Sequence, residues 1–315
     1  METRALGSLR VSVVGLGCNN FGRRVDAAGT AHVVDEALAT GINFFDTADI
    51  YGDTRSEELL GSALGARRSA VVLATKFGMK VAGDERRRGA RPEYVRRALE
   101  DSLRRLRTDY VDLYQLHEPD PQTPISDTLG ALDALVREGK VREIGCSNFS
   151  AAQIVEAHEA AGYGAARFVS VQNEYSLLHR DPEVEVLAEC SRLGLAFIPY
   201  FPLASGALTG KYARGRPAPE GSRLSSGGQR DRFLNPANEE AIERLRSFAE
   251  SRDHSLLELA FAWLLAHPPV ASVIAGATRR EQVAANAAAA SWRLSKEELD
   301  EVDRVAPQPR VESRV

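Results

Sequence analysis

Four polar residues that could act together in one reaction stand at the ends of apolar segments. Asp46 and Tyr51 lie in FFDTADIYG, Lys76 ends VVLATK, and His117 ends VDLYQLH. If these segments are neighbouring strands of a parallel barrel, the four side chains meet at its C-terminal mouth, where such barrels place their chemistry. A tyrosine hydroxyl can donate a proton to a carbonyl oxygen that a histidine orients. The pattern predicts a site for carbonyl reduction.

Each of these residues alone also has a plainer interpretation, such as a turn, a helix cap or a packed aromatic ring. The four residues together indicate a shared site more strongly than any one of them does alone. Lys76 would be buried with its charge, which is costly unless a carboxylate pairs with it, and Asp46 can supply that carboxylate. The Lys76 cation is then expected to favour the phenolate of Tyr51 and to lower its pKa from ~10. His117 is expected to donate a hydrogen bond to the carbonyl oxygen.

Short apolar runs alternate with longer amphipathic stretches along the whole chain. The eight runs are VSVVGLG, INFFDTA, AVVLATK, VDLYQLH, VREIGCSN, FVSVQNEY, LAFIPYF and VASVIAGA. The helix-like stretches between the first six are residues 30–40, 56–64, 92–106, 126–138 and 151–161. Eight strand–helix units without hairpins predict an α/β fold, a (β/α)8 TIM barrel, as a single domain over residues 1–315. GLGCNNFG after the first run does not begin a phosphate-binding helix, which disfavours an open dinucleotide-binding sheet.

Two segments depart from this alternation. Residues 211–236 are rich in Gly, Pro, Ser and Arg, and we expect them to be mobile until a bound ligand orders them. Residues 239–250 and 255–267 both have helical patterns, so an inserted helix is expected before strand 8. Residues 295–305 begin with a capping box, Ser295 and Glu298, and predict a C-terminal helix.

Composition limits the possible partners. The net charge is −4 and no basic tract dominates, which disfavours nucleic acid. Cys18, Cys146 and Cys190 lack metal-ligand spacing and suggest a reduced, cytoplasmic protein. No apolar run approaches the ~20 residues that span a bilayer. We therefore expect no bound metal and no membrane contact, while the oligomeric state stays open.

Several ordered motifs resemble those of the aldo-keto reductase family over essentially the whole chain. They are FFDTADIYG, LATKFG, YQLHEPD, IGCSN, VQNEYS, PYFPLASGALTGKY and IAGATRREQVAAN. HEPDPQTP and GATRREQ are most similar to the branch of bacterial sugar and aldehyde reductases and potassium-channel β subunits. The resemblance implies a (β/α)8 barrel, an extended NAD(P)H across its mouth, and reduction of a small-molecule carbonyl.

The resemblance also implies roles for individual residues. Tyr51 is the general acid, Asp46 and Lys76 tune it, and His117 positions the carbonyl. Three residues hold the nicotinamide carboxamide and one aromatic residue stacks on the ring: Ser147, Asn148, Gln172 and Tyr200. The pyrophosphate is wrapped by Pro202, Leu203, Ala204, Ser205, Gly206 and Lys211, with Arg223 from the closing loop. The adenosine end contacts Gly276, Thr278, Gln282 and Asn286.

The remaining expected cofactor contacts lie where the chain departs from many relatives or where two interpretations compete. Cys18, Asn19 and Phe201 are the departures, and Gly17, which directly precedes Cys18, is a further expected contact. Cys18, Asn19 and Asn20 replace a frequent Thr and Trp, and Phe201 replaces a frequent Ser. Arg279 and Arg280 could each read a 2′-phosphate or belong to a solvated helix start. NADPH is the expected cofactor, with NAD as the alternative.

Two other function classes compete with a reductase. The channel β relatives suggest a cofactor-binding sensor or regulatory subunit with little turnover. Those relatives replace the catalytic His with Asn, whereas His117 is present here, and this favours a working reductase. A metal-dependent barrel hydrolase is disfavoured, because no His-x-His or paired carboxylates stand at the strand ends. The identity of the carbonyl substrate stays open.

Overall fold

The computed structural model describes residues 1–81, 83–84, 86–225 and 227–306. Within them, eight parallel strands form a nearly closed barrel with the order β10-β3-β4-β5-β6-β7-β8-β9. The strands are β3 (Val14–Gly17), β4 (Phe44–Asp46), β5 (Val72–Phe77), β6 (Val111–Leu116), β7 (Val141–Ser147), β8 (Phe168–Glu174), β9 (Ala196–Tyr200) and β10 (Val273–Gly276). A parallel bridge between Phe197 and Val270 brings the two edges together. The predicted TIM barrel is confirmed.

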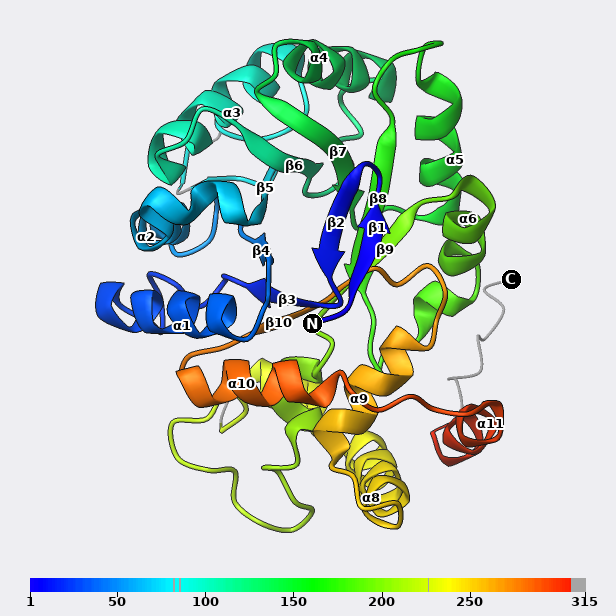
Figure 1. Cartoon of the computed structure of the whole chain (residues 1–315). Helices are drawn as coiled ribbons and strands as arrows, with labels where there is room; N and C mark the ends of the chain where they lie inside the picture. Colours follow the sequence, from blue (N-terminus) through cyan, green and yellow to red (C-terminus); the bar gives the residue numbers. More distant parts are fainter. Residues whose placement is uncertain (82, 85, 226, 307–315) are drawn as a thin grey trace.

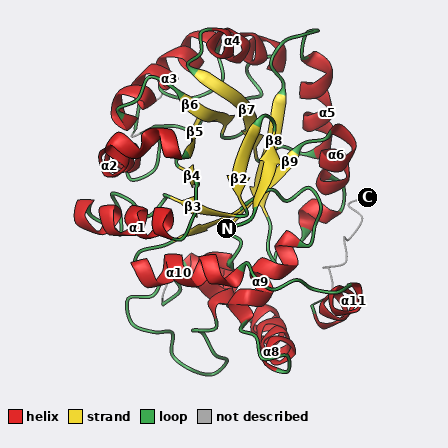
Figure 2. Cartoon of the chain, viewed as in Figure 1, coloured by secondary structure: helices red, strands yellow, loops and turns green. Residues whose placement is uncertain are grey.

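Helices surround the strands in a ring (Figure 2). They are α1 (Ala27–Ala39), α2 (Arg55–Leu64), α3 (Pro92–Leu106), α4 (Ile125–Arg137), α5 (Ala151–Ala160), α6 (Val186–Leu193), α7 (Gly228–Phe233), α8 (Pro236–Glu250), α9 (Leu256–Leu265), α10 (Arg280–Ala289) and α11 (Lys296–Val305). Both α8 and α9 lie between β9 and β10, so the inserted helix is confirmed. Helix α11 begins with the predicted capping box, in which Ser295 accepts a hydrogen bond from the backbone N–H of Glu298.

The expectation of a chain without hairpins was wrong at the N-terminus. Strands β1 (Thr3–Leu6) and β2 (Leu9–Ser12) form an antiparallel hairpin that lies across one end of the barrel (Figure 1). The run VSVVGLG, predicted as one strand, is divided because β2 ends at Ser12 and β3 begins at Val14. Leu6, Leu9 and Val11 are buried against barrel residues that include Phe44 and Leu113. Their burial explains the hairpin, which covers the N-terminal end of the barrel with apolar side chains.

The barrel interior changes from apolar to polar along its axis. The hairpin side chains pack on the apolar layer at the N-terminal end, whereas Asp46, Lys76, Gln115 and Gln172 are buried towards the C-terminal end. Outside the strands, one apolar cluster reaches from Val13 to Ala306 and joins the barrel to its helices. Residues 307–315 of the predicted domain lie outside the described residues. The fold therefore positions its polar residues at the C-terminal mouth.

Candidate active site

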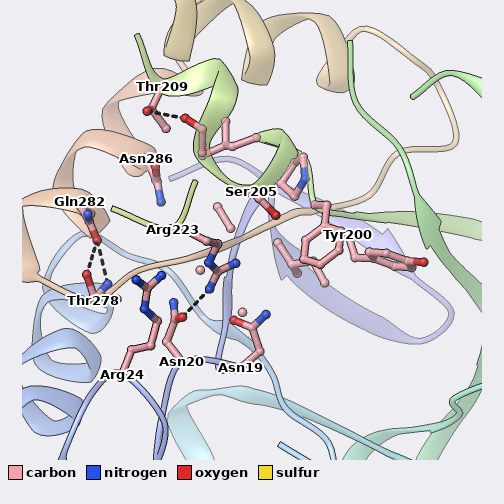
Figure 3. A pocket seen from close by; sticks show the side chains of 18 of the residues that line it. Asn19, Asn20, Arg24, Tyr200, Ser205, Thr209, Arg223, Thr278, Gln282 and Asn286 are labelled. Atoms are coloured by element: carbon pink, nitrogen blue, oxygen red, sulfur yellow. Dashed lines mark hydrogen bonds between the residues drawn. The ribbon is translucent and has the colours of Figure 1, made fainter. Parts of the chain in front are cut away.

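A cavity of about 1010 Å³ opens at the C-terminal ends of the barrel strands. Figure 3 shows side chains from strand ends, loops and α10 pointing into it. The expected residues that line it are Gly17, Asn19, Asp46, Tyr51, His117, Ser147, Asn148, Gln172, Tyr200, Phe201, Pro202, Leu203, Ser205, Gly206, Lys211, Arg223, Gly276, Thr278, Arg279, Gln282 and Asn286. The structure thus brings together residues from both halves of the chain.

An ion pair between Asp46 and Lys76 stands at the inner end of this cavity. Lys76 Nζ lies 2.5 Å from Asp46 Oδ1 and 2.9 Å from the carbonyl oxygen of Thr47. The Asp46 side chain is 2% exposed and the Lys76 side chain is 1% exposed. Burial lowers the pKa of Lys76, but Asp46 and Tyr51 raise it by more, so the pKa exceeds its ordinary value of 10.5. Lys76 is therefore a fixed cation behind the cavity wall.

Tyr51 receives a hydrogen bond from this cation. Lys76 Nζ donates to the Tyr51 hydroxyl oxygen at 3.4 Å, and the ammonium group lies 5.0 Å from the ring centroid. An ammonium group only donates, so the hydroxyl keeps its own hydrogen for another acceptor. Tyr51 lines the cavity, where that acceptor could bind.

The expected lowering of the Tyr51 pKa was wrong for the ligand-free protein. Burial raises the pKa of Tyr51 above its ordinary value of 10.0, and the opposing effect of Lys76 is smaller. The nearby Asp46 carboxylate also raises the pKa, since it compensates the Lys76 charge. Tyr51 consequently carries its proton at neutral pH, which is the form that a proton donor requires.

His117 lies against Tyr51 as a neutral imidazole. The two rings make an edge contact with centroids 5.8 Å apart. Burial, assisted by the Lys76 charge, holds the pKa of His117 well below its ordinary value of 6.5. Its Nδ1 atom is buried and has no hydrogen-bond partner among the described residues. A neutral imidazole retains one N–H group, which can donate to a carbonyl oxygen in the cavity.

Two amide side chains, Asn148 directly after β7 and Gln172 in β8, stand beside this group. Asn148 has a left-handed backbone, with φ of 61°. Its Nδ2 donates to the carbonyl oxygen of His117 at 2.9 Å, and its Oδ1 accepts from the Tyr200 hydroxyl at 2.8 Å. Gln172 Nε2 donates to Asp46 Oδ2 at 3.0 Å. The left-handed backbone of Asn148, a conformation that Asn adopts more readily than most residues, lets its amide reach both His117 and Tyr200.

The segment after β9 has the same kind of backbone. Phe201, Ala204 and Ser205 have φ of 50°, 45° and 56°. Three left-handed non-glycine residues so close together cost roughly 1–3 kcal/mol each and indicate a ligand-binding turn. Ser205 Oγ donates to Gln229 Oε1 of α7 at 2.8 Å, which ties this turn to the segment 211–236.

Positively charged side chains gather at the outer end of the cavity. Arg24, Lys211, Arg223 and Arg279 all line it. Arg223 donates to Asn20 Oδ1 at 2.5 Å, and burial together with Arg24 and Arg23 lowers the pKa of Arg223. Figure 3 shows Arg24, Asn20 and Arg223 side by side. This concentration of positive charge is suited to an anionic ligand.

The two arginines that the sequence left undecided are separated by the structure. Arg279 lines the cavity, whereas Arg280 pairs with Glu36 at 3.0 Å and does not line it. For Arg280 the solvated helix start is therefore the better interpretation. Arg24 was not predicted, because it lies in a loop without a recognisable pattern.

Three expected residues do not line the cavity. Lys76 acts from behind Tyr51. The Cys18 side chain is fully buried, with Sγ 3.6 Å from the carbonyl oxygen of Leu16, and Ala204 is also fully buried. Direct contact between these two side chains and a ligand is thus not supported, because neighbouring residues cover them.

The segment 211–236 is less irregular than its composition suggests. It contains the short helix α7, and its Leu224 and Phe233 side chains are buried. The Leu224 N–H donates to the Tyr212 hydroxyl at 3.2 Å. These apolar anchors, which sequence reasoning missed, place Arg223 beside Asn20. Residue 226 lies outside the described residues, and ordering of the segment by a ligand stays a prediction.

The described residues contain no group of three or more His, Cys, Asp or Glu side chains that could hold a metal ion. Among them, no helix combines the length and apolar character needed to cross a membrane.

Comparison with known proteins gives the family. Residues 13–307 match the sequence model of the Aldo/keto reductase family. An uncharacterized oxidoreductase of Bacillus subtilis (strain 168), YrpG, is 35% identical over 98% of this chain and 97% of its own length. A probable aldo-keto reductase of Glycine max is 34% identical over 94% of this chain and 86% of its own length.

Two further relatives cover almost the full chain. A probable voltage-gated potassium channel subunit beta of Oryza sativa subsp. japonica is 35% identical over 97% of this chain and 96% of its own length. The holo form of the aldo-keto reductase AKR11C1 from Bacillus halodurans superimposes with a TM-score of 0.83 at 35% identity, covering 99% of both chains. The family match, these relatives and the shared fold show that this chain, with its Asp–Tyr–Lys–His group, belongs to the aldo/keto reductase family of oxidoreductases.

Proposed function

We propose that this protein reduces an aldehyde, ketone or sugar carbonyl to an alcohol, with NADPH as the reductant and NADH as the alternative. The observation that carries the proposal is the arrangement of Tyr51. Its oxygen accepts a hydrogen bond from the Lys76 cation, and its proton stays available in the cavity beside the neutral His117. A proton donor and a carbonyl-orienting group thus share one small volume.

The cavity residues fit a nicotinamide dinucleotide. Ser147, Asn148 and Gln172 offer amide and hydroxyl groups at the inner end, next to the Tyr200 ring. Lys211 and Arg223 offer cations for phosphates at the outer end. The bound cofactor would supply the hydride that reduces the carbonyl carbon.

The protein's own residues would deliver the proton. His117 donates its N–H to the carbonyl oxygen and fixes its position. Tyr51 gives its hydroxyl proton to that oxygen as negative charge develops, a contribution worth ~10²- to 10⁴-fold in rate. Lys76 stabilises the phenolate that remains, since its ammonium already donates to the Tyr51 oxygen. Asp46 keeps Lys76 paired throughout, which limits the cost of the buried cation.

The apolar wall near Tyr51 would hold the carbon skeleton of the substrate. Ile50 and Met79 line the cavity, and neither was predicted from the sequence. Their presence favours a substrate with an apolar portion next to its carbonyl group.

A turnover assay tests the proposal. A panel of aldehydes, ketones and sugars is incubated with the protein and NADPH or NADH, and both cofactor oxidation and alcohol formation are followed. We expect at least one carbonyl to give stoichiometric alcohol and oxidised cofactor. Tight cofactor binding without turnover of any carbonyl would contradict the reductase.

That second outcome would favour a cofactor-binding regulatory subunit. The observation behind this alternative is the rice relative named as a probable potassium channel subunit beta. The presence of both Tyr51 and His117 in the cavity is the argument for the reductase instead.

A further inference from the structure

Gln115 is a buried amide in the barrel interior that the proposed mechanism does not use. It lies on β6, is fully buried and does not line the cavity. In the strand register it stands beside Lys76 of β5 on one side and Gly145 of β7 on the other. A polar side chain placed so deeply needs hydrogen-bond partners.

Its partners are two residues of the site. Gln115 Nε2 donates to Asp46 Oδ2 at 3.1 Å. Its Oε1 accepts from Gln172 Nε2 at 3.2 Å. Gln172 Nε2 also donates to Asp46 Oδ2, at 3.0 Å. Gln115, Gln172 and Asp46 thus form a closed triangle of hydrogen bonds, which we call the amide triangle.

Space for the amide triangle depends on Gly145. A Cβ atom at this position would lie 2.5 Å from Ser170 Oγ and 3.3 Å from Gln115 Cγ. The absence of a side chain at Gly145 therefore leaves room first for Ser170 and also for Gln115 in the barrel interior.

The carboxylate determines how both amides are oriented. Asp46 is paired with Lys76 through Oδ1, and an ionised carboxylate only accepts hydrogen bonds. Both amide nitrogens must therefore face Oδ2. The two hydrogens of Gln172 Nε2 are then used, one by Asp46 and one by Gln115 Oε1. Gln172 Oε1 is left as the group that it can offer to a ligand, and it is an acceptor.

We propose that Gln115 is a positioning residue that fixes Gln172 as a hydrogen-bond acceptor for the amino group of the nicotinamide carboxamide. This inference rests on the proposed function, because it assumes a nicotinamide cofactor. It adds a role that none of the residue assignments above includes: the ion pair beside the proton donor and the amide that orients the cofactor share one buried partner. The carboxamide orientation would in turn decide which face of the ring points at the carbonyl.

The test uses two oxidised cofactors that differ in a single group. NADP⁺ carries a carboxamide, and its 3-acetylpyridine analogue carries a methyl group in place of the amino group. Dissociation constants for both are measured by calorimetry on the wild type and on three variants. Gln172→Met removes the acceptor, Gln115→Met removes the hydrogen bonds to Gln172 and Asp46 while the acceptor stays in place, and Ser170→Ala is the matched control. Ser170 Oγ is buried in the same interior and has no hydrogen-bond partner among the described residues.

The wild type and Ser170→Ala should prefer NADP⁺ by about tenfold, the usual effect of one buried hydrogen bond left unmade. Gln172→Met should show almost no preference. In Gln115→Met the preference for NADP⁺ should fall to about threefold or less, although every residue that lines the cavity is unchanged. If Gln115→Met does not fold in a thermal unfolding assay, Gln115→Asn, whose amide is too short to reach both partners, should give the same ratio.

A full tenfold preference in a folded Gln115 variant would overturn the inference, as would equal binding of the two cofactors by the wild type. Both results leave the reductase proposal intact, since that proposal depends on turnover of a carbonyl. Failure of the wild type to bind any nicotinamide dinucleotide would instead remove the proposed function and this inference together.

Discussion

Within the described part of the chain, the charged side chains are paired at one end of the cavity and unpaired at the other. At the inner end, Asp46 and Lys76 are almost fully buried and paired at 2.5 Å. At the outer end, Lys211, Arg223 and Arg279 line the cavity, and no ion pair involves them within the described residues. Strands supply the inner charges, whereas loops and the edge of α10 supply the outer ones.

This difference suits the inner end to proton transfer and the outer end to binding of the cofactor. A buried and compensated cation changes little when a ligand enters, so it can hold the Tyr51 hydroxyl in place for proton transfer. Uncompensated cations at an open rim gain most of their stabilisation from an anionic ligand. We therefore expect inner variants to affect the chemical step and protein stability, and outer variants to affect cofactor affinity.

The largest effect is expected at Tyr51. Tyr51→Phe removes only the transferable proton, so carbonyl reduction should fall by ~10²- to 10⁴-fold. The dissociation constant for NADPH, measured by fluorescence quenching, should stay within about twofold of the wild type, because the ring remains. Near-full activity in this variant would remove Tyr51 as the general acid.

Asp46→Asn should mainly reduce stability. It leaves the buried Lys76 without a countercharge, and breaking such a pair costs about 3–5 kcal/mol. Urea unfolding monitored by circular dichroism gives the free energy. Arg223→Gln at the outer end is the comparison and should lower the free energy of unfolding by only about 1 kcal/mol or less. Equal losses in the two variants would mean that the two ends do not differ in charge compensation.

The pH dependence of reduction should follow Tyr51 alone. The reaction needs the protonated hydroxyl, whose pKa burial raises above 10.0. The single-turnover rate should therefore be level through neutral pH and fall, by up to tenfold per pH unit, only above about pH 10. The His117 pKa is well below 6.5, so no step is expected near that pH. A decline that begins near pH 8 would show that Lys76 outweighs burial.

Arg279 and Arg280 are adjacent and give a matched pair at the outer end. Arg279→Ala should weaken NADPH binding by about tenfold, the scale of one charged hydrogen bond, and leave NADH binding unchanged. Arg280→Ala should change neither, because Arg280 pairs with Glu36 outside the cavity. Titrations with both cofactors measure this. Equal affinity of the wild type for NADPH and NADH would show that no cation here reads the 2′-phosphate.

The smallest effect concerns the segment 211–236. We expect trypsin to cut between residues 214 and 230 in the ligand-free protein, and saturating NADPH to slow the cut several-fold through contacts with Lys211 and Arg223. The buried Leu224 and Phe233 should keep the ligand-free rate moderate. Identical cleavage rates with and without NADPH would remove the cofactor-closing role of this segment.

The sequence revealed the barrel because parallel strands are buried on both faces. Runs such as INFFDTA therefore stay apolar, with Phe44 directed to the interior cluster and Phe45 to the outer one. The four catalytic candidates were visible because Asp46, Lys76 and His117 each stand at or next to a strand end and Tyr51 follows in the loop after β4. The N-terminal hairpin was missed because the run VSVVGLG continues without a break from β2 into β3.

Features that depend on distant contacts were not readable. The direction of the Tyr51 pKa shift follows from burial outweighing Lys76, a balance that exists only in the folded site. Gln115 was assigned no role from the sequence, although its position two residues before His117 places it on the same interior face. Arg24 has no motif and reaches the cavity only through its loop.

Two quantities measured on two variants test most directly whether proton delivery and cofactor binding are separate. Single-turnover reduction at saturating NADPH and the NADPH dissociation constant are determined for Tyr51→Phe and Arg223→Gln. We predict that Tyr51→Phe loses the rate and keeps the affinity, while Arg223→Gln loses about tenfold in affinity and keeps the rate. A fall of both quantities in both variants would contradict the separation of proton delivery from cofactor binding.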